Sequence, residues 1–404
     1  MADGSLTPAL DSDPARRVSA AVRVGVIYLA SRVVTTLFML GTAALSTAAS
    51  RHGVNPSLGE LFVGWDAQWY WLIADQGYPS DLPMSDSGHV AQNAWAFMPL
   101  FAVLAKVVGF GVWPIGALVV TLVAGYLACL VFYRLMRERL DRSAASWAVL
   151  FLASGPMAAM FQLGYAESLN LLWLMLALWC VVHRKFWWLY LLVPLMGFTR
   201  PGVLAFSLFL ALYGIWRWMH RRSDPLPTAQ VVHIVALGIW AALVGFSWQI
   251  IAGLVTGDPS AYLDTELSWR IAWVGDGPFI PFAAWVQASE FWFSLWGLGN
   301  VTGYVVLAAL VLGTMAALIW LPAVRRLGVE VRLWAAAYVV YLLAVFFPQS
   351  SVFRLLFPLS PLWGAMAVPR SPWWRGGVLA ARLLGPWRGI MPMYGLGNQY
   401  WQVP

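Results

Sequence analysis

Residues 65–79 read WDAQWYWLIADQGYP, a stretch in which four of the first seven residues are aromatic and the second is an acid, Asp66. Tryptophan and tyrosine gather where a lipid bilayer meets water. The glycine and proline of Gly77-Tyr78-Pro79 are a stop signal for a helix. The stretch therefore predicts a short amphipathic helix on a membrane surface, and the acid within it asks for an explanation.

On a helical reading of residues 64–76, one apolar stripe follows helical spacing; its members are Trp65, Trp69, Leu72 and Ile73. Asp66 and Tyr70 lie on the flank of this stripe. Asp66 stands near the start of the predicted helix, where a carboxylate suits the positive end of the helix dipole. It could therefore simply cap the helix, and a functional role needs support from other parts of the chain.

The whole chain has the composition of a polytopic membrane protein. Of its 404 residues, 61% are hydrophobic and only 11% are charged, whereas soluble domains carry about 25% charged residues. The net charge of +7 does not indicate a nucleic-acid partner, because basic residues in a membrane protein first of all set its topology. The five histidines show no paired spacing, so we expect neither a metal nor another cofactor.

Ten apolar runs have near-spanning length. They lie at about 24–46, 115–133, 146–163, 168–183, 186–199, 202–219, 231–255, 300–321, 332–347 and 353–369. The stretches 94–108 and 283–298 are ambiguous, and we treat both as non-spanning. The expected organisation is a cytoplasmic N-terminus at 1–23, a membrane domain at 24–369 and a cytoplasmic tail at 370–404.

The basic residues orient these spans. With both termini in the cytoplasm, the inner segments hold most of the 25 lysines and arginines, as the positive-inside rule expects. A full span at 94–108 would move the basic cluster at 134–142 outside, so we expect 94–108 to lie along the outer surface. Most acids fall in two large outer loops, 47–114 and 256–299, which places the working face outside a plasma membrane.

Three further ionisable residues come out at short turns on the same predicted outer face. Glu167 lies in QLGYAES, Arg200 in GFTRPG and Arg354 in PQSSVFRLLFP. Ionisable groups at membrane depth are costly, and each is a candidate functional residue. Guanidinium groups bind phosphate with paired hydrogen bonds, and a carboxylate can deprotonate a hydroxyl. Together with Asp66, they suit a substrate with a lipid tail and an anionic head.

The motif at 65–79, followed by AWAFMPLF at 94–101, resembles the PIG-V family of GT-C-fold mannosyltransferases. This family uses mannose linked to a polyprenyl or dolichyl phosphate. Tyr165-Ala166-Glu167-Ser168 is similar to the family's Tyr-Thr-Glu-Ser, and Thr199-Arg200-Pro201-Gly202 to its Thr-Arg-Ser-Asn-Gly turn, with Pro in place of Ser and no Asn. The resemblance covers roughly residues 20–365. It implies a GT-C-like bundle of about ten transmembrane helices, with surface helices in the first outer loop.

The resemblance also implies a reaction. An acid in the first outer loop activates the acceptor hydroxyl, and Asp66 matches that position. Many relatives carry two adjacent acids there, but Ala67 follows Asp66 here, so Glu167 is the candidate second acid. We expect the donor phosphate to bind at Arg200, Arg354 and Arg270. The predicted lining of the substrate site comprises Trp65, Trp69, Tyr70 and Tyr165.

The predicted function is therefore an inverting membrane glycosyltransferase. It would move mannose from polyprenyl-phosphate-mannose to a hydroxyl of a glycan or glycolipid in a bacterial cell envelope. A transporter or flippase of a lipid-linked sugar is the alternative, although transporters favour inverted repeats and charges near the bilayer midplane. A scaffold protein, which would tolerate the loss of Asp66, is a third reading.

Overall fold

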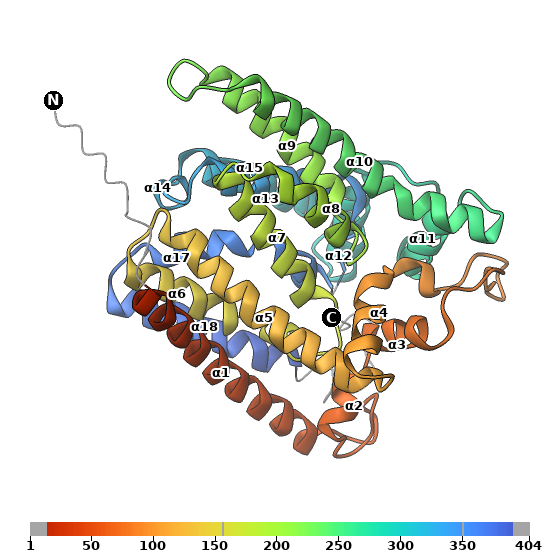
Figure 1. Cartoon of the computed structure of the whole chain (residues 1–404). Helices are drawn as coiled ribbons and strands as arrows, with labels where there is room; N and C mark the ends of the chain where they lie inside the picture. The colour runs from red at the N-terminus through yellow and green to blue at the C-terminus, as the bar shows by residue number, and fades with distance from the viewer. Residues whose placement is uncertain (1–13, 156, 350, 391–404) are drawn as a thin grey trace.

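The computed structural model describes residues 14–155, 157–349 and 351–390. Within these residues the chain is helical and contains no strand, only one isolated bridge between Met84 and Val90. The elements that build the membrane bundle are α1 (Pro14–Leu45), α5 (Trp113–Arg137), α6 (Arg142–Ala153), α7 (Glu167–Val182), α8 (Leu189–Gly197), α9 (Val203–Met219), α10 (Thr228–Thr256), α13 (Asn300–Trp320) and α15 (Val329–Val345). Figure 1 shows these helices lying side by side in a layered bundle.

Shorter elements connect them. They are α2 (Leu58–Phe62), α3 (Asp66–Gln76), η1 (Ala94–Ala96), α4 (Pro99–Val108), η2 (Ala158–Phe161), η3 (Phe186–Trp188), α11 (Ala261–Val274), α12 (Ala283–Leu295), α14 (Pro322–Arg325), α16 (Val352–Leu355), η4 (Phe357–Leu362), α17 (Trp363–Ala367) and α18 (Pro372–Ile390). We call the end of the bundle that carries α2, α3 and α4 the site end.

The chain is an all-α, multi-pass membrane protein. Four of its described helices are long and apolar enough to cross a bilayer, namely Ser19–Leu45 within α1, α5, α10 and α13. The predicted spans 168–183, 202–219 and 332–347 match α7, α9 and α15 to within three residues at each end. Two other predicted spans are divided into shorter elements. The run 146–163 divides into α6 and η2, and the run 353–369 divides into α16, η4 and α17. Proline explains part of this, because Pro358 and Pro361 cannot donate the backbone hydrogen bonds of a continuous helix.

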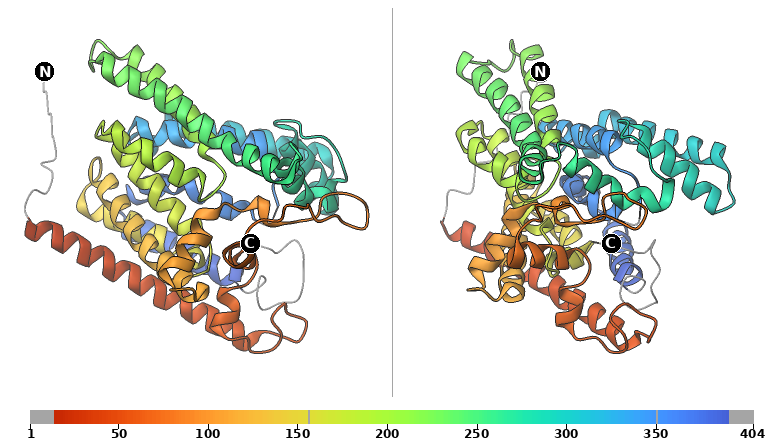
Figure 2. Two further views of the ribbon diagram at one scale, coloured as in Figure 1. Left: turned by 45° about the vertical axis from the view of Figure 1, so that its right-hand side comes forward. Right: turned by 90° about the vertical axis from the view of Figure 1, so that its right-hand side faces the viewer.

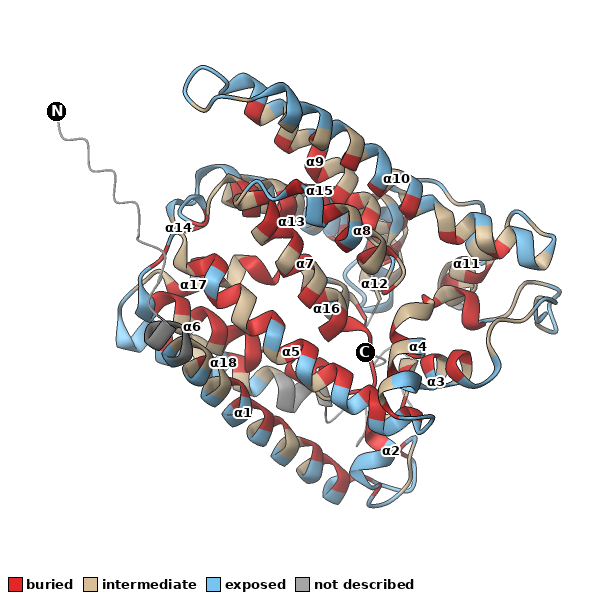
Figure 3. Cartoon of the chain, viewed as in Figure 1, coloured by how far each residue is buried: buried red, intermediate tan, exposed pale blue. Residues whose placement is uncertain are grey.

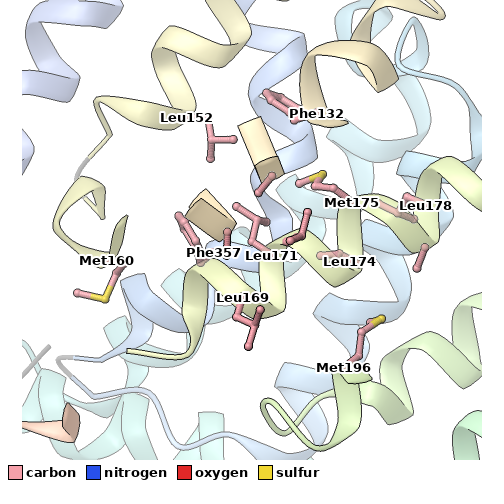
Figure 4. Close-up of a cluster of buried hydrophobic side chains, with 14 of the residues drawn as sticks. Phe132, Leu152, Met160, Leu169, Leu171, Leu174, Met175, Leu178, Met196 and Phe357 are labelled. Carbon is pink, nitrogen blue, oxygen red and sulfur yellow. The ribbon is translucent and has the colours of Figure 1, made fainter. Parts of the chain in front are cut away.

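The centre of the bundle is the contact between α5 and α7. Most of α7 is buried, and Figure 4 shows Leu171, Leu174 and Met175 among the packed side chains. Apolar burial alone gives helices little reason to associate in lipid, so close packing of small residues matters more. Gly125 of α5 illustrates this, since a Cβ there would come within 2.4 Å of the Tyr28 hydroxyl of α1.

The outer helices present apolar side chains to the surroundings. Only 11% of the residues in the most apolar stretch of α13 are buried within the protein. Helix α10 likewise exposes residues such as Ile250 and Leu254. Figure 3 shows the exposed outer faces of α1 and α10. These faces match lipid, because a water-exposed surface would be polar there.

The first loop differs from the prediction in two ways. The buried stripe of α3 consists of Ala67, Tyr70, Ile73 and Ala74, so the helix is rotated relative to the predicted stripe. The stretch 94–108 does not span, as predicted, but it is also packed into the bundle. Its helix α4 packs between α3 and α5 and fully buries Phe101 and Ala105. Contacts with neighbouring helices, which periodicity does not report, cause both differences.

The predicted tail at 370–404 also differs. Residues 372–390 form α18, which packs against α1 and α6 as part of the bundle. Figure 2 shows this helix running beside α1. Residues 391–404 and residues 1–13 lie outside the described residues.

Candidate active site

Two helices begin at the same place at the site end, and each begins with an acid. Asp66 is the first residue of α3, and Glu167 is the first residue of α7. Both carboxylates therefore lie where the helix dipole favours negative charge. The alternative role of Asp66 as a helix cap finds no support, because Trp65 is the N-cap residue of α3 and no side chain makes a capping hydrogen bond there. The Asp66 carboxylate has a different partner.

Two arginines complete a buried ion cluster, defined here as Asp66, Glu167, Arg200 and Arg354. Arg354 Nη1 donates to Asp66 Oδ2, and Arg200 Nη1 donates to Glu167 Oε1. Arg354 Nε also lies 3.4 Å from Glu167 Oε1, so it links the two pairs. The exposed fractions of the four side chains are only 2–13%. Charges this buried require mutual compensation, and two acids with two arginines provide it.

The backbone at Trp65 positions Asp66 in this cluster. Trp65 has φ +55° and ψ −125°, a conformation that favours glycine and costs about 1–3 kcal/mol for another residue. The Arg51 guanidinium lies 4.2 Å from the centre of the Trp65 ring, and the backbone N–H of Asp66 donates to the Tyr165 hydroxyl at 3.4 Å. Strained backbone next to a buried acid is typical of functional sites.

The turn between α8 and α9 positions Arg200. The Thr199 hydroxyl donates to the Leu195 carbonyl at 2.5 Å, and the Arg200 N–H donates to the Met196 carbonyl at 3.1 Å. Gly202 then adopts φ +126°, which turns the chain into α9. The Thr-Arg-Pro-Gly sequence thus forms a tight turn whose arginine faces the start of α7.

Arg354 comes from the far end of the sequence. It lies in the short helix α16, which Tyr338 of α15 holds through a hydrogen bond from its hydroxyl to the Leu355 carbonyl at 2.8 Å. The Arg354 guanidinium also lies 5.5 Å from the centre of the Tyr165 ring. An aromatic face stabilises a desolvated cation. Tyr165 therefore interacts with two members of the cluster: its hydroxyl accepts a hydrogen bond from the Asp66 backbone, and its ring lies near the Arg354 guanidinium.

The other predicted lining residues, Tyr70 and Trp69, differ in their contacts. Tyr70 is buried with its ring edge-on to Phe97 and Phe101, and its hydroxyl interacts electrostatically with all four members of the cluster. Trp69 is partly buried and stacks on Phe97 at 5.8 Å. Tyr70 thus lies near the ions, whereas the observed ring contacts of Trp69 are with Phe97 and Trp269.

Three buried polar atoms at this place lack a hydrogen-bond partner among the described residues. They are Oε2 of Glu167, an acceptor, and two donors, Nε1 of Trp65 and Nε of Arg354. Leaving such an atom unsatisfied costs about 1–3 kcal/mol. A bound molecule with both hydroxyl and anionic oxygen atoms would satisfy all three.

Burial raises the pKa of Asp66 above its ordinary value, and the nearby Glu167 carboxylate adds to this effect. Arg354 and Arg200 oppose the rise without cancelling it. A raised pKa makes Asp66 a stronger proton acceptor than an exposed aspartate. The geometry therefore allows Asp66 to act as a general base.

Sequence reasoning missed one acid, Glu266 of α11. Burial raises its pKa to about 7, against the lowering effects of a hydrogen bond with Tyr262 and of the Arg200 charge. The sequence held one hint, because Glu266 belongs to the second acid-rich loop, 256–299. It stands in no motif, and only the folded chain places it near Arg200.

Arg270, in contrast, is not joined to the ion cluster by any contact that we observe. Its guanidinium donates to the Pro278 carbonyl at 3.5 Å, within its own loop. Burial lowers the pKa of Arg270, and we find no acid paired with it in the described part of the chain. Its predicted role in phosphate binding stays a prediction. No group of three metal-ligating side chains occurs among the described residues either.

Comparisons with known proteins do not assign a family. No protein-family model matches the sequence, and no curated protein matches it. Three solved structures of an oligosaccharyltransferase from Archaeoglobus fulgidus are similar. The complex of AglB with an inhibitory peptide and a dolichol-phosphate has 13% identity and a TM-score of 0.43 over 92% of this chain and 56% of that one.

The form tethered to an acceptor peptide has 14% identity and a TM-score of 0.40 over 92% of this chain and 56% of that one. The apo form has 12% identity and a TM-score of 0.39 over 92% and 57%. This chain thus spans little more than half the length of these proteins. Similarity this low supports no assignment of function, and membership of the PIG-V-like family stays a prediction.

Proposed function

We propose that this protein is an integral-membrane glycosyltransferase that moves a sugar from a polyprenyl-phosphate carrier to a hydroxyl of an acceptor. The observation that carries the proposal is the buried ion cluster at one end of a lipid-facing bundle. It combines a carboxylate of raised pKa with two guanidinium groups. A lipid-linked sugar presents to such a site an anionic phosphate, and its acceptor presents a hydroxyl.

In the proposed reaction, the acceptor oxygen attacks the anomeric carbon of the donor sugar. The bond from that carbon to the phosphate oxygen breaks, and the phosphate keeps the electron pair. Asp66 takes the hydroxyl proton, so the configuration inverts in a single displacement. The phosphate leaves as an anion, which Arg354 and Arg200 stabilise, and no proton donor is required.

The two arginines must exchange partners during this reaction. Both contact a carboxylate in the present structure. When Asp66 takes a proton, its attraction for Arg354 falls, and the guanidinium becomes available to the phosphate. Proton transfer and phosphate stabilisation are thereby linked through Arg354.

The finer assignments follow from the resemblance to the PIG-V-like family. We propose a GT-C-like catalytic domain over residues 24–369, a mannose donor and an acceptor in a bacterial cell envelope. The site end then faces outward across the plasma membrane. The aromatic residues of α3 would hold the helix at the depth of the donor phosphate.

The test is transfer of labelled mannose from polyprenyl-phosphate-mannose to a mannoside acceptor by the purified full-length protein. We expect Asp66→Asn to lower the rate by about 10²–10⁴-fold, the usual contribution of a general base. Asp75→Asn, at an exposed position of the same helix, is the matched control and should keep the rate. Full transfer by a folded Asp66→Asn protein would exclude the proposed base, and movement of the lipid donor without transfer would favour a flippase.

A further inference from the structure

We propose that Glu266 forms part of the acceptor site, where its carboxylate accepts hydrogen bonds from hydroxyl groups of the acceptor sugar. This proposal rests on the proposed glycosyltransferase function and adds a residue from the second long loop. Glu266 belongs to α11, far from the first loop in the sequence but close to it in the fold.

Two contacts fix the face that α11 turns to the site. The buried hydroxyl of Thr265 accepts a hydrogen bond from the Asn93 amide at 2.9 Å. Three residues after Glu266, the Trp269 ring lies edge-on to Trp69 of α3, with ring centres 6.1 Å apart. Residues three apart share a helix face, so Glu266 is turned toward the first turn of α3, where Asp66 lies.

Glu266 differs from the acids of the ion cluster in its partners. Asp66 and Glu167 both contact a guanidinium group. Among the described residues, no basic group forms a salt bridge with Glu266, that is, none has a nitrogen within 4.0 Å of its carboxylate oxygens. Its observed side-chain hydrogen bond is to Tyr262, one helical turn earlier. A carboxylate has about four acceptor positions, so Glu266 keeps capacity for the hydroxyl groups of a sugar.

The surroundings of Glu266 make its charge sensitive to pH near neutrality. The groups that face it are Tyr262 on its own helix, Arg200, Asp66 and Tyr341. Burial is the strongest influence and raises the pKa of Glu266 to about 7. The side chain is therefore neutral below that pH and ionised above it. Hydrogen bonds to an ionised carboxylate are stronger, so acceptor binding should tighten as the pH rises through 7.

The experiment measures KM for the mannoside acceptor and for polyprenyl-phosphate-mannose between pH 6 and pH 8. For the unaltered protein, we expect the acceptor KM to fall about tenfold over this range. In Glu266→Gln, the acceptor KM should not change between pH 6 and pH 8. At pH 8 it should be about tenfold above that of the unaltered protein, with little change in the donor KM. Glu266→Asp should regain the pH dependence, and Glu290→Gln, in the neighbouring α12, is the control that should behave normally.

An unchanged pH dependence of the acceptor KM in Glu266→Gln would overturn the proposal. So would an equal rise in the KM of the donor, because a purely structural role would disturb both substrates. If the unaltered protein transferred no sugar from the lipid donor, the proposed function itself would fall, and the acceptor site with it.

An independent observation concerns α18. We infer that this helix lies within the membrane and that the chain leaves it at the site end, on the side opposite to the predicted cytoplasmic tail. The burial pattern of α18 is inverted relative to a helix in water. Arg375 and Arg382 are 6% and 7% exposed, whereas Trp373 and Leu384 are 90% and 62% exposed. Lipid explains apolar side chains that point outward and arginines that point inward.

The contacts of the two arginines give the direction of α18. The Arg375 guanidinium donates to the Ser143 hydroxyl at 2.9 Å, near the start of α6. Arg382 Nε donates to the Phe151 carbonyl at 2.6 Å, near the end of α6. The two helices therefore run in the same direction, and α6 leads through η2 to Glu167 at the site end. The left view of Figure 2 shows α18 following this course beside α1.

Helix α6 ends within the bundle, and this explains why buried arginines are needed at this depth of the membrane. The last carbonyl groups of a helix have no partner within that helix, which is especially costly in a bilayer. Arg382 bonds the Phe151 carbonyl, and Arg32 of α1 bonds the carbonyls of Ala153 and Ala158. Arg382 thus completes the backbone hydrogen bonding of a helix that stops within the bundle.

Length agrees with this placement. A helix from Pro372 to Ile390 has 19 residues, and at 1.5 Å per residue it measures about 28 Å, close to the thickness of a hydrocarbon core. Ile390, the last residue of α18, therefore lies at the site end.

Labelling of single cysteines with a membrane-impermeant maleimide in intact cells tests this topology. Cys129 and Cys180, both buried, are first replaced by serine. Asp81→Cys marks the site end, and Arg222→Cys, in the loop from α9 to α10, marks the opposite end. We expect Ile390→Cys, at the end of α18, to be labelled under the same conditions as Asp81→Cys. Labelling of Ile390→Cys together with Arg222→Cys would overturn the inference.

Discussion

The contact between Arg354 and Asp66 offers the most direct test of the ion cluster. We predict that Arg354→Gln destabilises the folded protein, because Arg354 compensates Asp66 and also lies 3.4 Å from Glu167. Its loss leaves two acids with one arginine. Removing one partner of a buried ion pair typically costs about 3–5 kcal/mol. Asp66 is 13% exposed and Arg354 is 11% exposed, so solvent screens this pair only weakly.

The cost should depend on pH, and its sign can be worked out. Burial already raises the pKa of Asp66, and the loss of Arg354 removes an opposing influence, so the pKa rises further in the variant. A group whose pKa is raised on folding contributes stability at low pH that is lost as the pH rises through the folded value. The deficit of Arg354→Gln should therefore be small near pH 4 and grow toward neutral pH.

The assay is equilibrium unfolding in mixed detergent micelles, followed by tryptophan fluorescence, for Asp66→Asn, Arg354→Gln and the double variant. We expect the double variant to be more stable than the sum of the single effects predicts, by at least about 1 kcal/mol, because it leaves no unpaired charge at this contact. Additive effects within about 0.5 kcal/mol, or single effects below 1 kcal/mol, would refute the buried, coupled pair.

Three further predictions follow from single contacts. Gly202→Ala should destabilise the protein by about 1–3 kcal/mol, because alanine is strained at φ +126°, and it should lower transfer by displacing the neighbouring Arg200; unfolding and activity measurements check both effects. The transfer rate should fall as the pH drops below the raised pKa of Asp66, and this acidic limb should disappear from the residual activity of Asp66→Asn. Arg382→Leu should cost about 1–3 kcal/mol in an unfolding assay, because the Phe151 carbonyl loses its partner; equal stability would contradict the observed contact.

The sequence by itself determined the class of the protein and the main landmarks. A bilayer selects for long apolar helices, and composition and hydropathy report that selection directly. The long spans α1, α5, α10 and α13 therefore fall where the apolar runs predicted them. The motif at 65–79 indicated a helix whose acid required an explanation, and helix α3 begins at that acid.

Tertiary structure decided the finer features of the bundle. Hydropathy distinguishes apolar from polar residues, but it does not distinguish a lipid contact from a protein contact. The buried face of α3 was consequently predicted incorrectly, and the packing of α4 against α3 and α5 was not predicted. For the same reason α18, with its inward-facing arginines, read as a tail although it packs within the bundle.

The candidate site depends most on the fold. Asp66 and Arg354 are 288 positions apart, and no local pattern states that they touch. The sequence suggested their roles separately through turns and resemblance, whereas the tertiary structure brings Arg354 of α16 into contact with Asp66 of α3 and Glu167 of α7. Glu266 carries no motif, and its environment exists only because Trp269 and Thr265 dock α11 onto the first loop. Local sequence determines which side chains are available, and long-range packing determines which charges must compensate one another.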